Sequence, residues 1–188
     1  MKQKLILTIF AFSFLAVSIV GQSIKVGIGG GYTTLSGDNS FTAENILNLK
    51  SGMHYGGKVI VGLPVLPIQF TGNIYQNSLS NDAAGIKTET SFLSVGLGAE
   101  MNLLPGPLQP YLAAELLFTS FGDVTYNDIT VAAEESETGL GLGAGVYFKL
   151  LPVVDLDLSA HYNMNTLFGS SDALNSTHIR LNILYSFL

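Results

Sequence analysis

The sequence predicts an all-β fold, an eight-stranded antiparallel up-and-down transmembrane β-barrel. Three observations predict it. Apolar and polar residues alternate with a period of two over long stretches, and the connections between these stretches alternate between short and long. In addition, the chain is apolar although no run after residue 20 is long enough to span a bilayer as a helix. Its 188 residues suit a single domain.

The N-terminal segment predicts a cleavable signal peptide. Lys2 and Lys4 precede an apolar stretch from Leu5 to Val20, and the small residue Gly21 follows it. A transmembrane anchor is the competing interpretation, but the stretch is short and no cluster of positive residues follows it. We therefore expect a signal peptide at residues 1–21 and a barrel domain at residues 22–188.

Charge and cysteine content exclude several classes of function. The formal net charge is −6, and removing two of the eight basic residues and none of the fourteen acids with the signal peptide gives 6 − 14 = −8. Such acidity disfavours a nucleic-acid partner, because nucleic acid is bound by Lys and Arg at its phosphates. The absence of Cys excludes a disulfide framework, a thiolate metal site and a lipid-modified cysteine.

Eight alternating stretches follow the signal peptide. Most are longer than the five or six residues typical of strands in soluble proteins, and they are long enough to cross a bilayer at a tilt. In order, they cover residues 24–35, 53–63, 68–79, 88–103, 110–121, 136–150, 155–167 and 177–188.

The connections between the stretches alternate strictly in length. The short ones cover residues 64–67, 104–109 and 151–154, and the long ones cover residues 36–52, 80–87, 122–135 and 168–176. Leu-Pro ends a strand at each short turn, because proline cannot donate a hydrogen bond to the ladder. This asymmetry is typical of outer-membrane barrels, which have tight periplasmic turns and longer extracellular loops.

Each stretch has one apolar face and one polar or glycine-rich face. A soluble barrel would show the same alternation with its apolar face inside, but its exterior would be expected to carry more charge. We expect the polar face to form a network of paired charges in the lumen, because an unpaired buried charge is costly. The residues of this network are Lys25, Lys58, Glu100, Glu115, Glu137, Lys149, Asp155, Asp157 and Arg180, and Glu89 is assigned to the same face.

Aromatic residues on the apolar face fall near both ends of the strands, as two membrane interfaces predict. Near the long loops they are Tyr32, Tyr55, Phe118 and Tyr162, and near the short turns they are Phe70, Phe148, Tyr185 and Phe187. Ordinary enrichment of aromatic residues in strands is the alternative explanation.

The chain resembles the family of small outer-membrane β-barrels typified by the membrane domains of OmpA- and OmpX-type proteins. The resemblance rests on the signal peptide, the opening strand IKVGIGGGYTTL, the Leu-Pro turns and the terminal strand HIRLNILYSFL. It implies location in a Gram-negative outer membrane and a C-terminal strand that the insertion machinery recognises. Barrels of this family commonly finish on an aromatic residue, whereas here Phe187 is followed by Leu188. The family shares an architecture and no single activity, so it implies no specific function.

Three motifs could carry chemistry, and each has a simpler explanation. One strand face carries an acid, a hydroxyl and a base, which are Asp157, Ser159 and His161. Same-face neighbours on a strand are about 6.6 Å apart, which is long for a catalytic relay. The three side chains also point inward, which fits interior polar packing. The runs GIGGGY and GLGLGAG open no predicted helix, so their glycines are better explained by space inside a narrow barrel than by phosphate binding. His54, His161 and His178 lie on three different predicted strands. We expect them to be hydrogen-bonding groups and not the ligands of a metal site.

The sequence favours an outer-membrane protein with a side-chain-filled lumen and a structural or surface-interaction role through its extracellular loops, especially residues 36–52 and 122–135. The expected partners are outer-membrane lipid, the insertion machinery and an extracellular protein or surface ligand. No enzymatic activity, cofactor or metal is expected. The alternatives are an outer-membrane enzyme that modifies envelope lipid and an exported, soluble, lipocalin-like barrel that binds a ligand in an apolar cavity.

Overall fold

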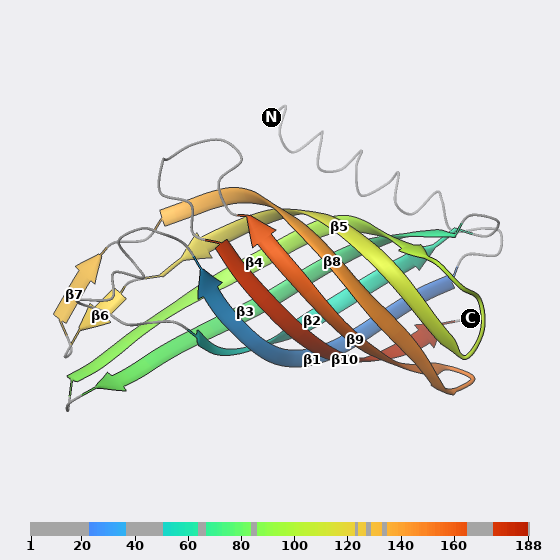
Figure 1. Ribbon diagram of the computed structural model, residues 1–188, viewed down its shortest axis with the longest axis horizontal. Helices are drawn as coiled ribbons and strands as arrows, with labels where there is room; N and C mark the ends of the chain where they lie inside the picture. The colour runs from blue at the N-terminus through green and yellow to red at the C-terminus, as the bar shows by residue number, and fades with distance from the viewer. Residues whose placement is uncertain are drawn as a thin grey trace, which may run out of the picture.

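Eight long strands close into an antiparallel β-barrel (Figure 1). The structure is a computed structural model that describes residues 23–36, 51–63, 67–83, 86–122, 124–126, 129–132, 135–164 and 175–187. The barrel strands are β1 (Ser23–Ser36), β2 (Ser51–Gly62), β3 (Ile68–Ala83), β4 (Ile86–Asn102), β5 (Leu108–Phe121), β8 (Glu135–Leu151), β9 (Val154–Met164) and β10 (Asn175–Phe187). The predicted signal peptide, residues 1–21, lies outside the described residues.

Strand pairing follows the order of the chain around the barrel. Each strand pairs antiparallel with its neighbours in sequence, except that β5 pairs with β8 because β6 and β7 lie outside the wall. The pairing of β1 with β10, from Ile24 opposite Phe187 to Ser36 opposite Asn175, closes the barrel. The predicted eight-stranded up-and-down barrel is therefore confirmed. No helix in the described ranges is long and apolar enough to cross a bilayer.

The sheet extends beyond the barrel wall at the long-loop end, at the left of Figure 1. β3 and β4 remain paired as far as Ala83 opposite Ile86, well past the end of the pairing of β2 with β3 at Gly52 and Leu79. β6 (Val124–Tyr126) pairs with β4, and β7 (Ile129–Ala132) pairs with β6. Most of residues 80–87 and part of residues 122–135, predicted as loops, are thus strands. The alternation of apolar and polar residues fades there, so the sequence pattern did not reveal them.

The apolar face of the barrel is outside and the polar face is inside. In β10, for example, His178, Arg180 and Asn182 are buried, whereas Ile179 and Leu181 are exposed. This arrangement is the reverse of a soluble lipocalin-like barrel, whose apolar side chains would line the interior. Of the aromatic residues predicted at the two ends of the wall, all are exposed except Phe148, which is half-buried.

Glu89 does not belong to the polar face. Its side chain is exposed, like those of Leu93 and Leu97. Glu89 and Glu100 are an odd number of positions apart in one continuous strand, so their side chains point to opposite faces. The assignment of Glu89 to the lumen is therefore wrong.

Glycines on the inner wall make room for large side chains from neighbouring strands. A Cβ atom on Gly143 of β8 would lie 2.6 Å from Nδ1 of His161, and one on Gly145 would lie 2.5 Å from the ring of Tyr111. Gly141 lies in the same way beneath the side chain of Glu115. The glycine run of β8 is thus explained by the space that a narrow barrel needs for its polar side chains.

Candidate functional site

One connected group of buried side chains surrounds Lys58 of β2. Its Nζ lies 2.7 Å from Oε1 of Glu100 on β4 and 2.7 Å from Oδ2 of Asp157 on β9. Lys58 is 3% exposed and the two carboxylates are 1% and 0% exposed. Because β2 is adjacent to neither β4 nor β9, these ion pairs cross the lumen. They link strands that the backbone ladder does not join.

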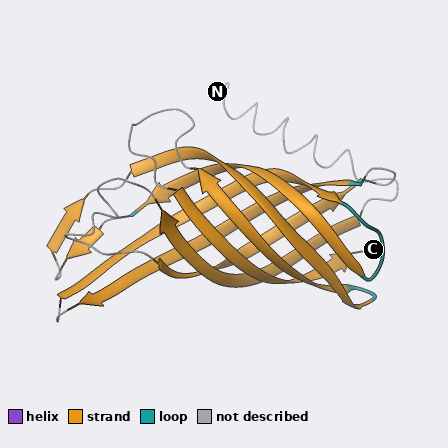
Figure 2. Ribbon diagram, viewed as in Figure 1, coloured by secondary structure: helices purple, strands orange, loops and turns teal. Residues whose placement is uncertain are grey.

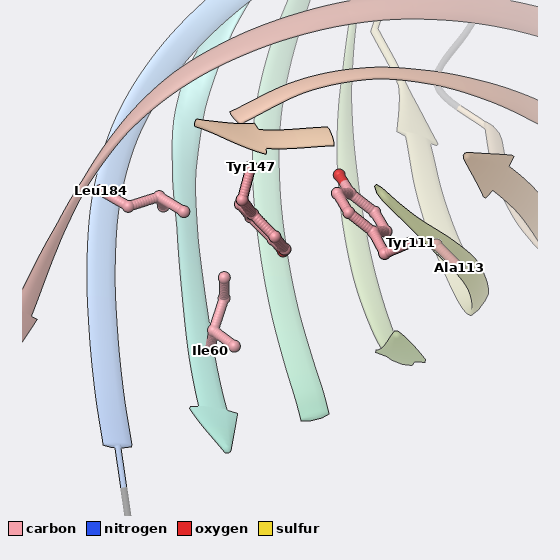
Figure 3. Close-up of a cluster of buried hydrophobic side chains, with 5 residues drawn as sticks. All are labelled: Ile60, Tyr111, Ala113, Tyr147 and Leu184. Atoms are coloured by element: carbon pink, nitrogen blue, oxygen red, sulfur yellow. The ribbon is translucent and has the colours of Figure 1, made fainter. Parts of the chain in front are cut away.

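Two tyrosines complete the group around Lys58. Tyr111 of β5 donates to Oδ1 of Asp157 at 2.6 Å, and Tyr147 of β8 donates to Glu100. Their rings stack with centroids 4.5 Å apart, and Lys58 Nζ lies 5.1 Å from each ring centroid. Figure 3 shows the tyrosines among the buried apolar side chains of this part of the lumen, which are Ile60, Ala113 and Leu184. The buried charges are therefore paired and lie among hydrophobic side chains. Because the dielectric constant is low in such surroundings, the attraction between the charges is stronger than it would be in water.

A second ion-pair group is centred on Glu115 of β5. Arg180 of β10 approaches Glu115 Oε1 at 3.1 Å, and His161 Nδ1 lies 3.3 Å from the same oxygen. Asn73 of β3 donates to Oε2 at 2.8 Å. The guanidinium of Arg180 also lies 4.8 Å from the ring centroid of Tyr75. Side chains from β3, β9 and β10 thus converge on one carboxylate of β5.

A third group, toward the long-loop end, contains no Lys, Arg, Asp or Glu and is organised by Thr33. Its hydroxyl donates to Oδ1 of Asn77 at 2.8 Å, because the amide nitrogen of Asn77 is directed at backbone carbonyls. The Thr33 oxygen is then left to accept from Nδ1 of His54 at 2.8 Å and from Nδ1 of His178 at 3.1 Å. Ser176 contacts Nε2 of His178 at 2.9 Å. These histidines are held by hydrogen bonds.

The predicted lumen charges are placed at different depths. Lys58, Glu100 and Asp157 form the first group, and Glu115 and Arg180 belong to the second. Lys25 pairs with Asp155 at 2.6 Å nearer the short-turn end. Glu137 is half-buried near the long-loop end. Lys149 is exposed at the short-turn rim, where the register of β8 against β9 shifts, and no ion pair of Lys149 is found within the described ranges.

Asp157, Ser159 and His161 are all buried on the inner face of β9, but they do not form a relay. Asp157 bonds to Lys58, Tyr111 and Asn182, whereas the carboxylate beside His161 is that of Glu115. The hydroxyl of Ser159 has no hydrogen-bond partner in the structure. Among the described residues there is also no group of three His, Cys, Asp or Glu side chains arranged to hold a metal ion.

Sequence reasoning missed the uncharged members of these groups. Each of these residues forms a hydrogen bond inside the barrel, either to a charged or imidazole side chain or to a residue that itself bonds to one. They are Tyr75, Tyr111, Asn73, Asn182 and Thr33. Each lies on the same strand face as the other inward-pointing side chains of its strand. Its position in the period-two alternation therefore indicated that it faces the lumen.

The comparisons with known proteins agree with this architecture. A family profile described as "Outer membrane protein beta-barrel domain" matches residues 5–187. Neisserial surface protein A has a similar structure, with a TM-score of 0.66 and 19% identity over 89% of this chain and 99% of that chain. Ail, the attachment invasion locus protein of Yersinia pestis, has a TM-score of 0.60 and 17% identity over 90% of this chain and 100% of that chain. No curated protein sequence matches the chain.

Proposed function

Because this chain belongs to the outer-membrane protein β-barrel domain family and lies in the cell outer membrane, we propose that it is a structural and surface-interaction protein. Its barrel is a closed anchor in the lipid, inserted by the barrel-insertion machinery through its C-terminal strand. Its outer end contacts a protein or surface ligand outside the cell. The proposal assigns no catalytic role, since the acid, hydroxyl and histidine of β9 face the lumen and form no relay.

The observation that carries the proposal is the sheet extension formed by β3, β4, β6 and β7. In the part of the chain that the structure describes, β7 pairs with β6 alone, so its other edge has free backbone donors and acceptors. Such an edge is a template for an extended segment of another protein. A strand that is already paired on one side also loses less entropy on binding than a free loop would.

The charge of the outer end indicates the kind of partner. The four long connections contain eight acidic residues and two lysines, which are Asp38, Glu44, Asp82, Asp123, Asp128, Glu134, Glu135 and Asp172, and Lys50 and Lys87. Ail has been solved in complex with the heparin analogue sucrose octasulfate, a polyanion. An outer end with a formal charge of 2 − 8 = −6 would repel such a ligand and attract a basic one.

Breaking β7 is expected to abolish attachment. In a non-adherent host strain, the full chain should raise attachment to cultured epithelial cells several-fold, and Ile129→Gly with Val131→Gly should return it to the level of the empty strain, because glycine weakens a strand. The matched control, Ile129→Val with Val131→Ile, keeps the strand propensity and should attach like the parent. Equal attachment by the glycine variant and its control would contradict the proposal.

The closed lumen is the second part of the proposal, and it is supported by the ion pairs and stacked tyrosines that cross the barrel. In planar bilayers the parent should show no porin-sized conductance steps. Tyr111→Ala with Tyr147→Ala should increase the frequency and size of channel events, because it removes two stacked rings from the lumen. The control, Tyr55→Ala with Tyr162→Ala, truncates two exposed tyrosines and should remain silent. Large steps in the parent would rule out a closed lumen.

A further inference from the structure

The short-turn end of the barrel exposes leucine side chains in its turns and at the adjoining strand ends. Leu104 lies in the turn between β4 and β5, and Leu151 ends β8. They are 59% and 58% exposed, as much as Leu97, which is 57% exposed in the middle of the lipid-facing wall. Leu103, Leu108 and Leu150 beside them are also exposed. We define these five leucines as the leucine rim, and the turns at this end of the barrel are teal at the right of Figure 2.

The rim is one continuous surface that joins the lipid-facing wall. β5 and β8 are neighbours, with Leu108 opposite Phe148, and the backbone N–H of Lys149 donates to the carbonyl of Pro107 at 2.8 Å. The two turns are thereby tied to each other. Since Leu103 and Leu150 continue the outward rows of β4 and β8, the apolar surface runs without interruption from the wall into the turns.

The turns also carry few polar groups that would need water. Residues 62–68, 103–109 and 150–154 contain no charged residue, and all six prolines of the chain lie in or directly beside them. Proline has no backbone N–H to satisfy. The N–H groups of Asn102 and Leu103 donate to the carbonyls of Pro67 and Pro110, both at 2.8 Å, and the Gln109 side chain donates to the Gly106 carbonyl. Satisfying backbone groups internally is the requirement for chain in contact with lipid.

The height of the apolar wall also indicates that the turns lie at the edge of the lipid. On β4 the outward row is polar at Ser91 and apolar from Leu93 to Leu103, and on β8 it is polar at Thr138 and apolar from Leu140 to Leu150. Ten residue steps of about 3.3 Å at a tilt of about 40° give a height of about 25 Å, which is the height of the apolar band of outer-membrane barrels. A band that begins below Ser91 and Thr138 therefore ends at the turns themselves.

We propose that the leucine rim is embedded in the phospholipid of the periplasmic leaflet and does not stand in periplasmic water. The turns lie at the boundary between acyl chains and headgroups, with Leu104 and Leu151 in contact with lipid. The outer end, with its projecting sheet and acidic loops, stands in water. We assign lipid as the partner of the rim because the rim is continuous with the lipid-facing wall.

The absence of cysteine from the sequence makes the test direct. Single-cysteine variants Leu104→Cys and Leu151→Cys are refolded into vesicles, labelled with an environment-sensitive fluorophore and exposed to iodide on both sides or to lipids brominated near the headgroup. Leu97→Cys is the lipid reference, and Ser80→Cys, at an exposed position of the β3 extension, is the water reference. Slower migration of each variant on a gel after boiling than before it verifies folding. All four positions are exposed, so each variant is expected to fold.

Brominated lipid should quench labels at positions 104 and 151 strongly, and iodide should quench them several-fold less than the label at position 80. Iodide quenching as strong as at position 80 would overturn the proposal and place this end in water. Shielding from both quenchers would also overturn it, because another protein or a second copy of the chain would then cover the rim. If one site folds poorly, Leu103→Cys or Leu150→Cys replaces it.

Discussion

Lys58→Met is expected to lower the free energy of unfolding by about 3–5 kcal/mol, because it leaves the buried carboxylates of Glu100 and Asp157 without their cation. Removal of one partner from a buried ion pair costs far more than removal of an exposed charge. The measurement is a urea titration in lipid vesicles, in which the folded fraction is read from the faster-migrating band on an unboiled gel. Gel mobility suits this chain, which has no Trp to report unfolding by fluorescence.

Two further variants separate the charge effect from the loss of the Lys58 side chain. Lys149→Met removes an exposed lysine from the same barrel and should change the unfolding free energy by less than about 0.5 kcal/mol. The triple variant Lys58→Met, Glu100→Gln, Asp157→Asn removes the unpaired charges and should recover much of the stability, because a buried pair replaced by neutral groups is often tolerated. If Lys58→Met and Lys149→Met were equally stable, the buried pairs would contribute nothing to the fold.

Gly143→Leu is expected to destabilise the barrel by about 3 kcal/mol, at the upper end of ordinary overpacking. The three atoms nearest to a Cβ on Gly143 all belong to His161, at 2.6–2.8 Å, so the imidazole would have to leave its place beside Glu115. The matched control is Gly72→Leu on the lipid-facing wall, where the nearest atom to a Cβ is Leu97 Cδ2 at 3.9 Å. That variant should be as stable as the parent or more stable.

The same clash predicts a specific rescue. Gly143→Leu with His161→Ala should be more stable than the sum of the two single effects allows, because truncation of the imidazole makes the space that leucine needs. The same urea titration measures all four proteins of the cycle. Additive effects would show that Gly143 is limited by something other than His161, such as the backbone of the neighbouring strand.

The sequence by itself determined the class of fold and the two faces of the wall. Side chains in a strand alternate with a strict period of two, so the row Ile179, Leu181 and Ile183 against His178, Arg180 and Asn182 fixes what faces lipid and what faces the lumen. The short Leu-Pro turns also fixed which end of the barrel is which. The same parity, followed along the continuous strand β4 from Glu100, places Glu89 on the outer face.

Only the tertiary structure decided which polar groups meet. Lys58 and Asp157 are 99 positions apart, and their contact depends on the closure of the barrel and the register of every strand between them. The polar extension of β3 and β4, and the addition of β6 and β7, likewise depend on backbone pairing that continues after the apolar alternation has ended. The local sequence pattern shows which face meets lipid, because the hydrophobic effect acts on each residue separately. Contacts across the lumen cannot be predicted from this pattern, because they depend on the register of every strand in the closed sheet.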